Sequence, residues 1–178
     1  MVESVFSVDG VLARADPHYQ PREGQLAMAQ AVAHAMGAGE VLVAEAGTGV
    51  GKTYAYLVPA LLSGERVLLS TATKALQDQL FSRDIPRLVQ ALEVPVRVAL
   101  LKGRSSYLCL HRLGMARHEV GEGAPQQIRV LAKIEEWSRS TRSGDLSELT
   151  GLDDRSPVIP RVTSTRENCL GSHCPNAK

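Results

Sequence analysis

The sequence predicts an α/β fold: a parallel sheet flanked by helices, followed by a mostly helical subdomain that contains cysteines. Three apolar runs, at residues 41–44, 66–70 and 96–101, have the length and composition of buried strands, and helix-compatible segments separate them. Strands that alternate with helices imply right-handed crossovers and a parallel sheet. From Lys102 onward the strand signals stop. We therefore expect one part at residues 1–101 and a second part at residues 102–178.

Composition describes a globular chain without a strong overall charge. The 178 residues are 44% hydrophobic and carry a formal net charge of +1, which excludes a globally basic nucleic-acid-binding protein. No apolar run is long enough to span a membrane, and the N-terminus lacks the pattern of a signal peptide. We therefore expect a cytoplasmic protein with no membrane partner. Three cysteines, an odd number, argue against a disulfide framework.

The first strong helix signal follows a weakly patterned start. Residues 1–20 show only a turn at Asp16-Pro17. Pro21 suits the first turn of a helix that runs to about Met36, where Gly37 is expected to end it. Apolar residues recur through this stretch at helical spacing, which predicts that one face packs against the core.

The first turn of this helix carries polar residues that match a nucleobase. The amide of Gln25 offers a donor and an acceptor, which suit N6 and N7 of adenine, and Arg22 lies close by. Packing alone would also explain this helix. The glycine-rich turn that comes later in the chain favours the interpretation of Gln25 as an adenine reader.

That glycine-rich turn reads Ala-Gly-Thr-Gly-Val-Gly-Lys-Thr at residues 46–53, between the first apolar run and the next helix. Its glycines let backbone N–H groups turn toward phosphate oxygens, and the positive end of the following helix adds its field. Lys52 would reach the β- and γ-phosphates, and the hydroxyl of Thr53 would hold Mg²⁺. An ordinary strand-to-helix turn does not explain Lys-Thr directly after the third glycine, so the pattern predicts nucleotide binding.

The predicted nucleotide site combines this turn with the earlier helix. Lys52 and Thr53 are its expected catalytic residues. The strict phosphate-loop pattern has glycine where this chain has Ala46, which is one departure. The residues expected to bind the nucleotide are Arg22, Gln25, Ala46, Gly47, Thr48, Gly49, Val50, Gly51, Lys52 and Thr53.

A second polar turn follows the second apolar run. Thr71, Thr73 and Lys74 stand at the start of a helix, where hydroxyls and backbone N–H groups suit an anion such as a nucleic-acid phosphate. Threonine at a helix start is also a common N-cap that needs no ligand, and both interpretations remain open.

The second part of the chain opens with a basic and aromatic segment. Lys102, Arg104 and Tyr107 are candidates for contact with a nucleic-acid strand, although most basic runs are only solvated faces. Further on, the pattern predicts a loop at residues 121–125 and a helix at residues 126–137.

The cysteines allow three interpretations. Cys169 and Cys174 have a spacing at the loose end of zinc sites, and His111 or His173 could add ligands. Buried packing cysteines are a second alternative. Iron–sulfur ligation by Cys109, Cys169 and Cys174 is the third.

Together these stretches resemble the front of a DinG/XPD-type iron–sulfur helicase of superfamily 2, in particular its bacterial branch. Residues 19–25 resemble the Q motif, and residues 45–53 (EAGTGVGKT) match motif I, in which alanine at position 46 is normal. Residues 70–80 (STATKALQDQL) are similar to motif Ia, and residues 102–109 (KGRSSYLC) to the segment around the first cluster cysteine. Ser106 departs mildly from the family, which more often has asparagine there.

The resemblance implies the first part of a RecA-like P-loop NTPase motor domain at residues 1–101 and a partial iron–sulfur subdomain at residues 102–178. It implies ATP, Mg²⁺ and a [4Fe–4S] cluster as cofactors, single-stranded DNA as a partner, and 5′→3′ DNA unwinding by the intact protein. Cys109, Cys169 and Cys174 would be three of four cluster ligands, and Thr71, Thr73, Lys74, Lys102, Arg104 and Tyr107 would contact DNA. The family's fourth cysteine and its Walker B carboxylates have no counterpart here, which predicts an N-terminal fragment. The alternative is a P-loop nucleotide-binding protein or kinase with a zinc-binding accessory subdomain.

Overall fold

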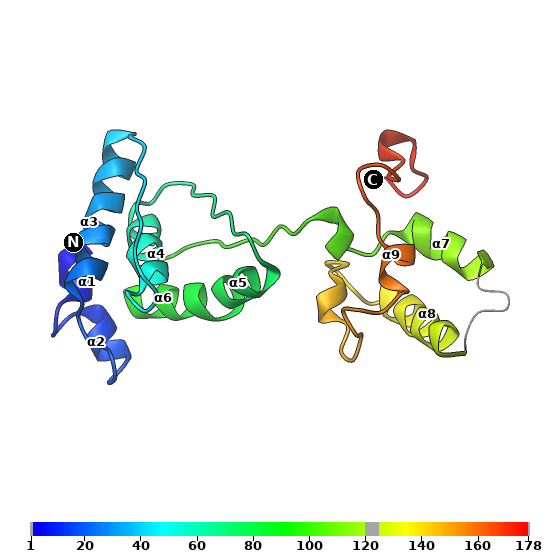
Figure 1. Ribbon diagram of the computed structural model, residues 1–178, viewed down its shortest axis with the longest axis horizontal. Helices are drawn as coiled ribbons and strands as arrows, with labels where there is room; N and C mark the ends of the chain where they lie inside the picture. The colour runs from blue at the N-terminus through cyan, green and yellow to red at the C-terminus, as the bar shows by residue number, and fades with distance from the viewer. Residues whose placement is uncertain (1, 120–124, 178) are drawn as a thin grey trace. The chain divides into compact units, whose positions relative to one another are not determined.

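The computed structural model describes residues 2–119 and 125–177. The chain divides into two compact units, Met1–Leu100 and Leu101–Lys178 (Figure 1). The loop expected at residues 121–125 lies outside the described residues apart from Pro125, which begins a helix. None of the described helices is long and apolar enough to cross a lipid bilayer.

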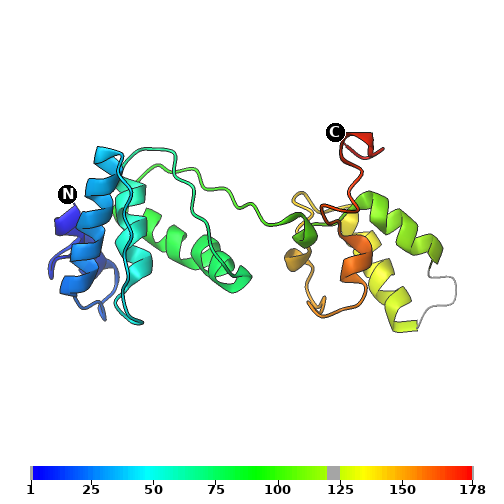
Figure 2. The same cartoon turned by 45° about the horizontal axis from the view of Figure 1, so that its top comes forward.

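Helices form the first unit, and two of them build its centre. Helices α3 (Glu23–Ala38) and α4 (Lys52–Leu62) pack side by side (Figures 1 and 2). Helix α3 continues through Gly37, so the predicted end at this residue is wrong; the helix ends instead at Gly39, which adopts the left-handed conformation with φ of 67°. The buried core of the unit contains Val5, Phe6, Leu12, Ala29, Ala55, Leu57, Val58, Leu80, Ile85 and Leu88.

The weakly patterned N-terminal residues contribute directly to this core. They form two short helices, α1 (Val2–Phe6) and α2 (Val11–Ala15), and α1 packs against α3 and α4. The turn between the two helices requires Gly10, because a Cβ atom there would lie 2.5 Å from the carbonyl oxygen of Ser4. Helices this short cannot show a periodic pattern, which explains why residues 1–20 carry no clear helix signal.

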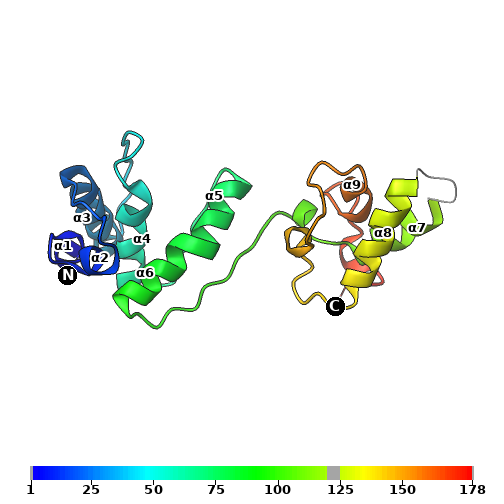
Figure 3. The ribbon, with the colours of Figure 1, turned by 90° about the horizontal axis from the view of Figure 1, so that it is seen from below.

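Residues 74–92 of the first unit form a long helical rod. Helix α5 (Lys74–Gln79), a π-helical turn (Leu80–Asp84) and helix α6 (Ile85–Leu92) follow one another without interruption (Figure 3). The wider π-helical turn places Asp84 in the interior. Turns of this kind are often found at functional sites.

The predicted parallel sheet is not formed among the residues that the structure describes. Residues 41–45, 66–70 and 96–100 are non-helical and share no backbone hydrogen bonds. Val41 and Val43 are each 93% exposed, and Leu68 is 92% exposed. Strands depend on hydrogen bonds to a neighbouring strand, and apolar strands of this composition also need cover on both faces. The sheet therefore stays a prediction.

The second unit has a small core of its own. Helices α7 (Leu110–Glu119), α8 (Pro125–Ser138) and α9 (Ile159–Val162) surround it, together with the short 3₁₀ turn at Leu146–Glu148. Two further 3₁₀ turns lie at Arg104–Ser106 and Gly171–His173. The helix expected at residues 126–137 is confirmed as α8. The core contains Leu113, Ala116, Leu131, Ile134, Leu146, Leu149, Val158 and Val162.

A buried ion pair fixes the first residues of this unit. Lys102 is 8% exposed, and its Nζ lies 2.8 Å from Oδ2 of Asp145 and donates to Oγ of Ser147 at 2.9 Å. Burial by itself would raise the pKa of Asp145, but hydrogen bonds from Lys102 and Ser147 outweigh it and hold that pKa below its ordinary value. The ion pair joins Lys102 to the 3₁₀ turn that follows Asp145.

The exchange Asp145→Asn should destabilise the second unit by about 3–5 kcal/mol, because it leaves the Lys102 ammonium buried without a counter-charge. Urea unfolding followed by circular dichroism and by the fluorescence of Trp137 would measure the change. Asp154→Asn is the matched control, since Asp154 is exposed.

The same ion pair predicts the direction of a pH effect. The pKa of Asp145 is lowered on folding. The ion pair therefore contributes fully to the free energy of unfolding above the pKa of an unfolded aspartate, about 3.9, and this contribution is lost as the pH falls through the lower pKa of the folded state. The stability difference between the wild type and Asp145→Asn should therefore shrink in acid. A difference that stays constant from neutral pH down to strong acid would contradict this assignment.

Candidate nucleotide-binding site

The glycine-rich turn leads directly into α4. Gly49 and Gly51 have φ of 85° and 87°, in the left-handed region that glycine adopts without strain. Lys52 begins the helix, and its Nζ donates to the carbonyl oxygens of Ala46 and Gly47, both at 2.7 Å. The turn thus curls around the ammonium. A phosphate oxygen is a stronger, charged acceptor than these carbonyls and would compete with them for the same donors.

Gln25 attaches helix α3 to this turn. The residue is only 5% exposed, and its Nε2 donates to the carbonyl oxygen of Gly51 at 2.9 Å. Its Oε1 accepts from the Tyr19 hydroxyl at 3.3 Å. A primary amide has two N–H donors and two lone pairs, so one donor and one acceptor remain. The remaining N–H can donate to N7 of adenine, and the remaining lone pair can accept from its N6 amino group.

The contact between Gln25 and Gly51 leaves no room for a larger residue. A Cβ atom on Gly51 would lie 2.1 Å from Nε2 of Gln25. Two independent constraints, the positive φ and the close approach, therefore require glycine at this position.

Arg22 and Tyr19 complete this side of the site. The Arg22 guanidinium donates to the carbonyl oxygen of Gly49. The Tyr19 hydroxyl lies 3.3 Å from the carbonyl oxygen of Phe6 as well as from Gln25, so α1 helps to position it. Burial raises the pKa of Tyr19, and the positive charge of Arg22 opposes this effect only in part. The hydroxyl therefore keeps its proton at neutral pH and can donate a hydrogen bond.

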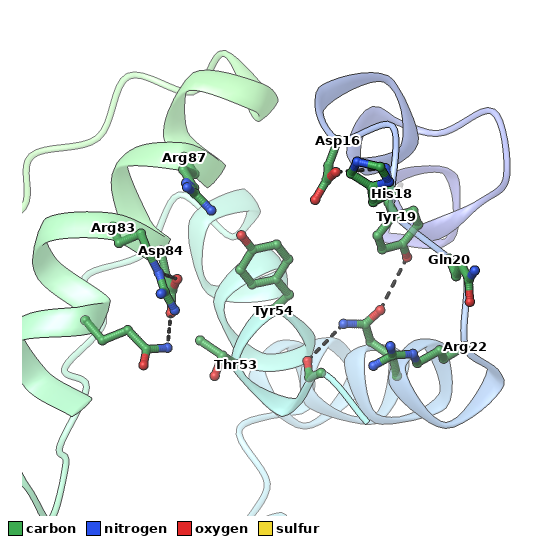
Figure 4. A pocket seen from close by; sticks show the side chains of 13 residues that line it. Asp16, His18, Tyr19, Gln20, Arg22, Thr53, Tyr54, Arg83, Asp84 and Arg87 are labelled. Carbon is green, nitrogen blue, oxygen red and sulfur yellow. Dashed lines mark hydrogen bonds and ion pairs between the residues drawn. The ribbon is translucent and has the colours of Figure 1, made fainter. Parts of the chain in front are cut away.

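These groups line a cavity of about 350 Å³ in the first unit (Figure 4). Tyr19, Arg22 and Gln25 form one wall, and Thr53 and Tyr54 from α4 form another. The volume lies within the range of small-molecule sites. Thr53, the expected Mg²⁺ ligand, therefore shares a cavity with the expected adenine reader.

The third wall of the cavity is one that sequence reasoning missed. It comes from the helical rod and includes Arg83, Asp84 and Arg87. The Asp84 carboxylate is buried and accepts from Nε2 of Gln79 at 2.8 Å and from Nε of Arg83 at 3.0 Å. The available signal was the spacing of Arg83 and Arg87, which are four residues apart and so share a helix face.

The candidate DNA-binding residues of the first unit lie at the start of α5. Thr73 is its N-cap, and its Oγ1 accepts from the backbone N–H of Leu76 at 3.2 Å. The capping alternative is therefore confirmed for this residue. Thr71 donates to the carbonyl oxygen of Thr73 at 3.4 Å, and Lys74 is exposed.

The candidate DNA-binding residues of the second unit are not equivalent. Lys102 is buried in its ion pair with Asp145, so the expectation that it presents a charge to DNA does not agree with this placement. Tyr107 is half-buried, and its hydroxyl accepts from the backbone N–H of Lys102 at 2.9 Å. Arg104 is exposed on a 3₁₀ turn.

Among its described residues, the structure does not group the three cysteines as a metal site, so their expected convergence stays a prediction. The backbone N–H of Cys109 donates to the carbonyl oxygen of Val162 at 2.8 Å, which fixes the start of α7 beside α9. Cys169 is exposed and Cys174 half-buried, in a segment that follows the last buried residue, Thr163. Within residues 2–119 and 125–177, no three His, Cys, Asp or Glu side chains are placed to hold one metal ion. As placed, the thiols fit neither an iron–sulfur cluster nor zinc.

Comparison with known proteins decides between the alternatives. Residues 26–143 match the DEAD/DEAH box helicase family. The chain belongs to this family. Membership implies a P-loop NTPase fold and leaves a zinc-containing kinase without support.

Relatives with known names agree with the family. The chain is 50% identical over 173 residues to the ATP-dependent DNA helicase YoaA of Escherichia coli, with 97% of the chain and 27% of the relative covered. The YoaA helicase of Haemophilus influenzae is 46% identical over 175 residues, with 98% and 27% covered. The ATP-dependent helicase DinG of Mycobacterium tuberculosis is 41% identical over 177 residues, with 86% and 26% covered. The chain thus spans about a quarter of the length of these relatives.

The exchange Gly51→Ala tests the attachment of α3 to the turn. It should displace Gln25 and lower the free energy of unfolding, because the new methyl group meets the amide and the backbone conformation becomes strained. Gly37→Ala is the matched control: no atom lies within 4 Å of its added Cβ, and alanine inside a helix should stabilise by about 0.5–1 kcal/mol. Thermal unfolding of both variants gives the comparison. Equal stability of Gly51→Ala and the wild type would show that the contact is absent in solution.

Proposed function

We propose that this chain is the first part of an ATP-dependent DNA helicase and that it binds ATP with Mg²⁺ and single-stranded DNA. The observation that carries the proposal is the attachment of the glycine-rich turn to α3 by two side chains, Gln25 at Gly51 and Arg22 at Gly49. This attachment joins an adenine reader to a phosphate cradle. The names of the relatives favour the same activity, and the 5′→3′ direction rests on the resemblance to the family alone.

ATP would lie along the cavity wall formed by α3 and α4. Lys52 would exchange its carbonyl acceptors for the β- and γ-phosphates, and Thr53 would contribute its hydroxyl to Mg²⁺. Gln25 would keep its contact with Gly51 and use its second donor and acceptor on adenine. The contact between Gln25 and Gly51 already holds the turn before the nucleotide binds, which limits the ordering that binding requires.

Binding should not lead to turnover in this chain. Phosphoryl transfer depends on positioned charges around the phosphates and the metal. The 178 residues contain no Asp-Glu pair of the kind that positions the metal in this family's Walker B motif. We therefore expect binding with negligible hydrolysis.

Single-stranded DNA would contact exposed residues of both units. Lys74 and the N-terminal N–H groups of α5 offer donors to phosphates in the first unit. Arg104 offers a charge in the second, where Tyr107 presents a half-buried ring. Thr71 and Thr73 would contribute mainly by shaping the start of α5, since both already take part in local hydrogen bonds.

The iron–sulfur cluster remains a prediction for the intact protein. The chain provides Cys109, Cys169 and Cys174 as free thiols, whereas a [4Fe–4S] cluster requires four ligands. No step of the proposed function depends on this group. Visible absorbance after anaerobic reconstitution with iron and sulfide would test for it.

Lys52→Ala should lower the affinity for ATP with Mg²⁺ by roughly ten- to a hundredfold, because it removes a charged hydrogen-bond donor to the phosphates. Fluorescence anisotropy with a labelled ATP analogue measures this effect. Arg66→Ala, which removes an exposed cation from the same unit, is the control and should bind as the wild type does. Steady multiple-turnover hydrolysis by the chain, or full affinity in Lys52→Ala, would refute the proposed arrangement.

Lys74→Ala combined with Arg104→Ala should weaken binding to a labelled oligothymidylate. The slope of log affinity against log salt should become shallower by about 0.7 for each phosphate that the variant no longer neutralises. Lys102→Ala is a useful comparison, because its charge is already neutralised by Asp145 and its effect should be on stability. If the double variant keeps the wild-type salt dependence, both exposed charges are ordinary solvated residues.

A further inference from the structure

A second cavity shares lining residues with the one beside the glycine-rich turn. The second cavity has a volume of about 510 Å³ and lies between α2 and α6, within the first unit. Both cavities are lined by the same four residues: Asp16, Tyr19, Tyr54 and Arg87. The two cavities therefore share part of their lining, and together we call them the groove. Gly51 lines its first cavity, and the apolar side chains of Leu12 and Leu88 line its second.

Tyr54 lines both cavities. It lies on the first turn of α4, directly after Thr53, and its side chain lines the cavity across from Tyr19 (Figure 4). The residue is half-buried, and its hydroxyl makes no hydrogen bond to the residues that the structure describes. The ring thus presents an aromatic surface to the groove beside the expected Mg²⁺ ligand.

Arg87 differs from the other arginines of the groove. Arg83 is bound to the Asp84 carboxylate, and Arg22 to the carbonyl oxygen of Gly49. Arg87 is exposed on α6 and has no ion pair or hydrogen bond with the described residues. Its guanidinium offers planar donors to a ligand in the groove.

The chemistry of the groove suits a flat heterocycle with acceptor atoms. An aromatic ring provides a stacking surface for a nucleobase, and a guanidinium donates to ring nitrogens or to sugar hydroxyls. The phosphates of the same ligand belong in the turn at residues 46–53. Gln25, Tyr54 and Arg87 all line the cavity beside this turn.

We propose that Tyr54 and Arg87 hold the nucleoside half of ATP and determine the preference for a nucleotide over a bare phosphate chain. Tyr54 stacks on the base, and Arg87 donates to acceptors of the base or ribose. The inference rests on the proposed function, because it requires that the phosphates occupy the glycine-rich turn. It adds two residues, one from α4 and one from α6, to a site otherwise formed by α3 and the turn.

Two ligands separate the two halves of the site. ATP carries base, sugar and phosphates, whereas inorganic tripolyphosphate carries the phosphate chain alone. Isothermal titration with each ligand and Mg²⁺ would be made on the 178-residue chain and on Tyr54→Ala, Tyr54→Phe and Arg87→Gln. Arg97→Gln is the matched control, since Arg97 is an exposed arginine of the same unit that does not line the groove.

Tyr54→Ala should lower the affinity for ATP about tenfold, as expected for the loss of one base–aromatic stack, and Tyr54→Phe should restore it. Arg87→Gln should lower the affinity for ATP several-fold, and Arg97→Gln should leave it unchanged. All four variants should bind tripolyphosphate as the wild type does. This last result also shows that the variants are folded around the turn.

Unchanged ATP affinity in both Tyr54→Ala and Arg87→Gln would overturn the inference while the proposed function stands. A parallel loss of ATP and tripolyphosphate binding would overturn it as well, because the two residues would then support the turn and not the nucleoside. A wild-type chain that binds neither ligand would instead refute the proposed function, and the inference with it.

Discussion

The site depends on the contact between the Gln25 amide and the carbonyl oxygen of Gly51. Gly51 is the last residue before α4, and its positive φ turns the backbone so that this carbonyl faces α3. The amide could not approach any residue with a side chain at this position. Because Tyr19 and, through it, the Phe6 carbonyl hold the other side of the amide, the short N-terminal helices, α3 and the glycine-rich turn form one connected assembly.

Sequence reasoning found the parts of this assembly that have strong local signals. The Gly-Lys-Thr run and its flanking elements identify the turn, and helical periodicity identifies α3 and α8. It missed α1 and α2, since five residues are too few for a period to emerge. It also missed the wall formed by Arg83, Asp84 and Arg87. The spacing of Arg83 and Arg87 places both on one helix face, but it does not indicate what that face packs against; the packing of α6 on α4 brings it to the cavity.

Two expectations depend on partners that lie far away in the sequence. Lys102 was assigned to DNA on the basis of its basic neighbours, but a carboxylate more than forty residues away, Asp145, takes up its charge. A single sequence does not show which residues this far apart will form an ion pair. The convergence of Cys109 with Cys169 and Cys174 likewise depends on how the terminal segment folds, and that segment buries no side chain that would draw it toward α7. The spacing of cysteines in the sequence indicates possible metal ligands, but only tertiary contacts bring those ligands together.

The three uncovered apolar segments bear on how such a chain behaves in solution. Val41, Val43 and Leu68 lie in stretches of high β-propensity whose backbone groups have no hydrogen-bond partners among the described residues of their own unit. A segment of this kind is a template on which a second copy can add a strand. Self-association would then compete with folding as a second-order process. We expect dilution and cold to preserve the monomer, since a second-order process slows on dilution and hydrophobic association weakens on cooling.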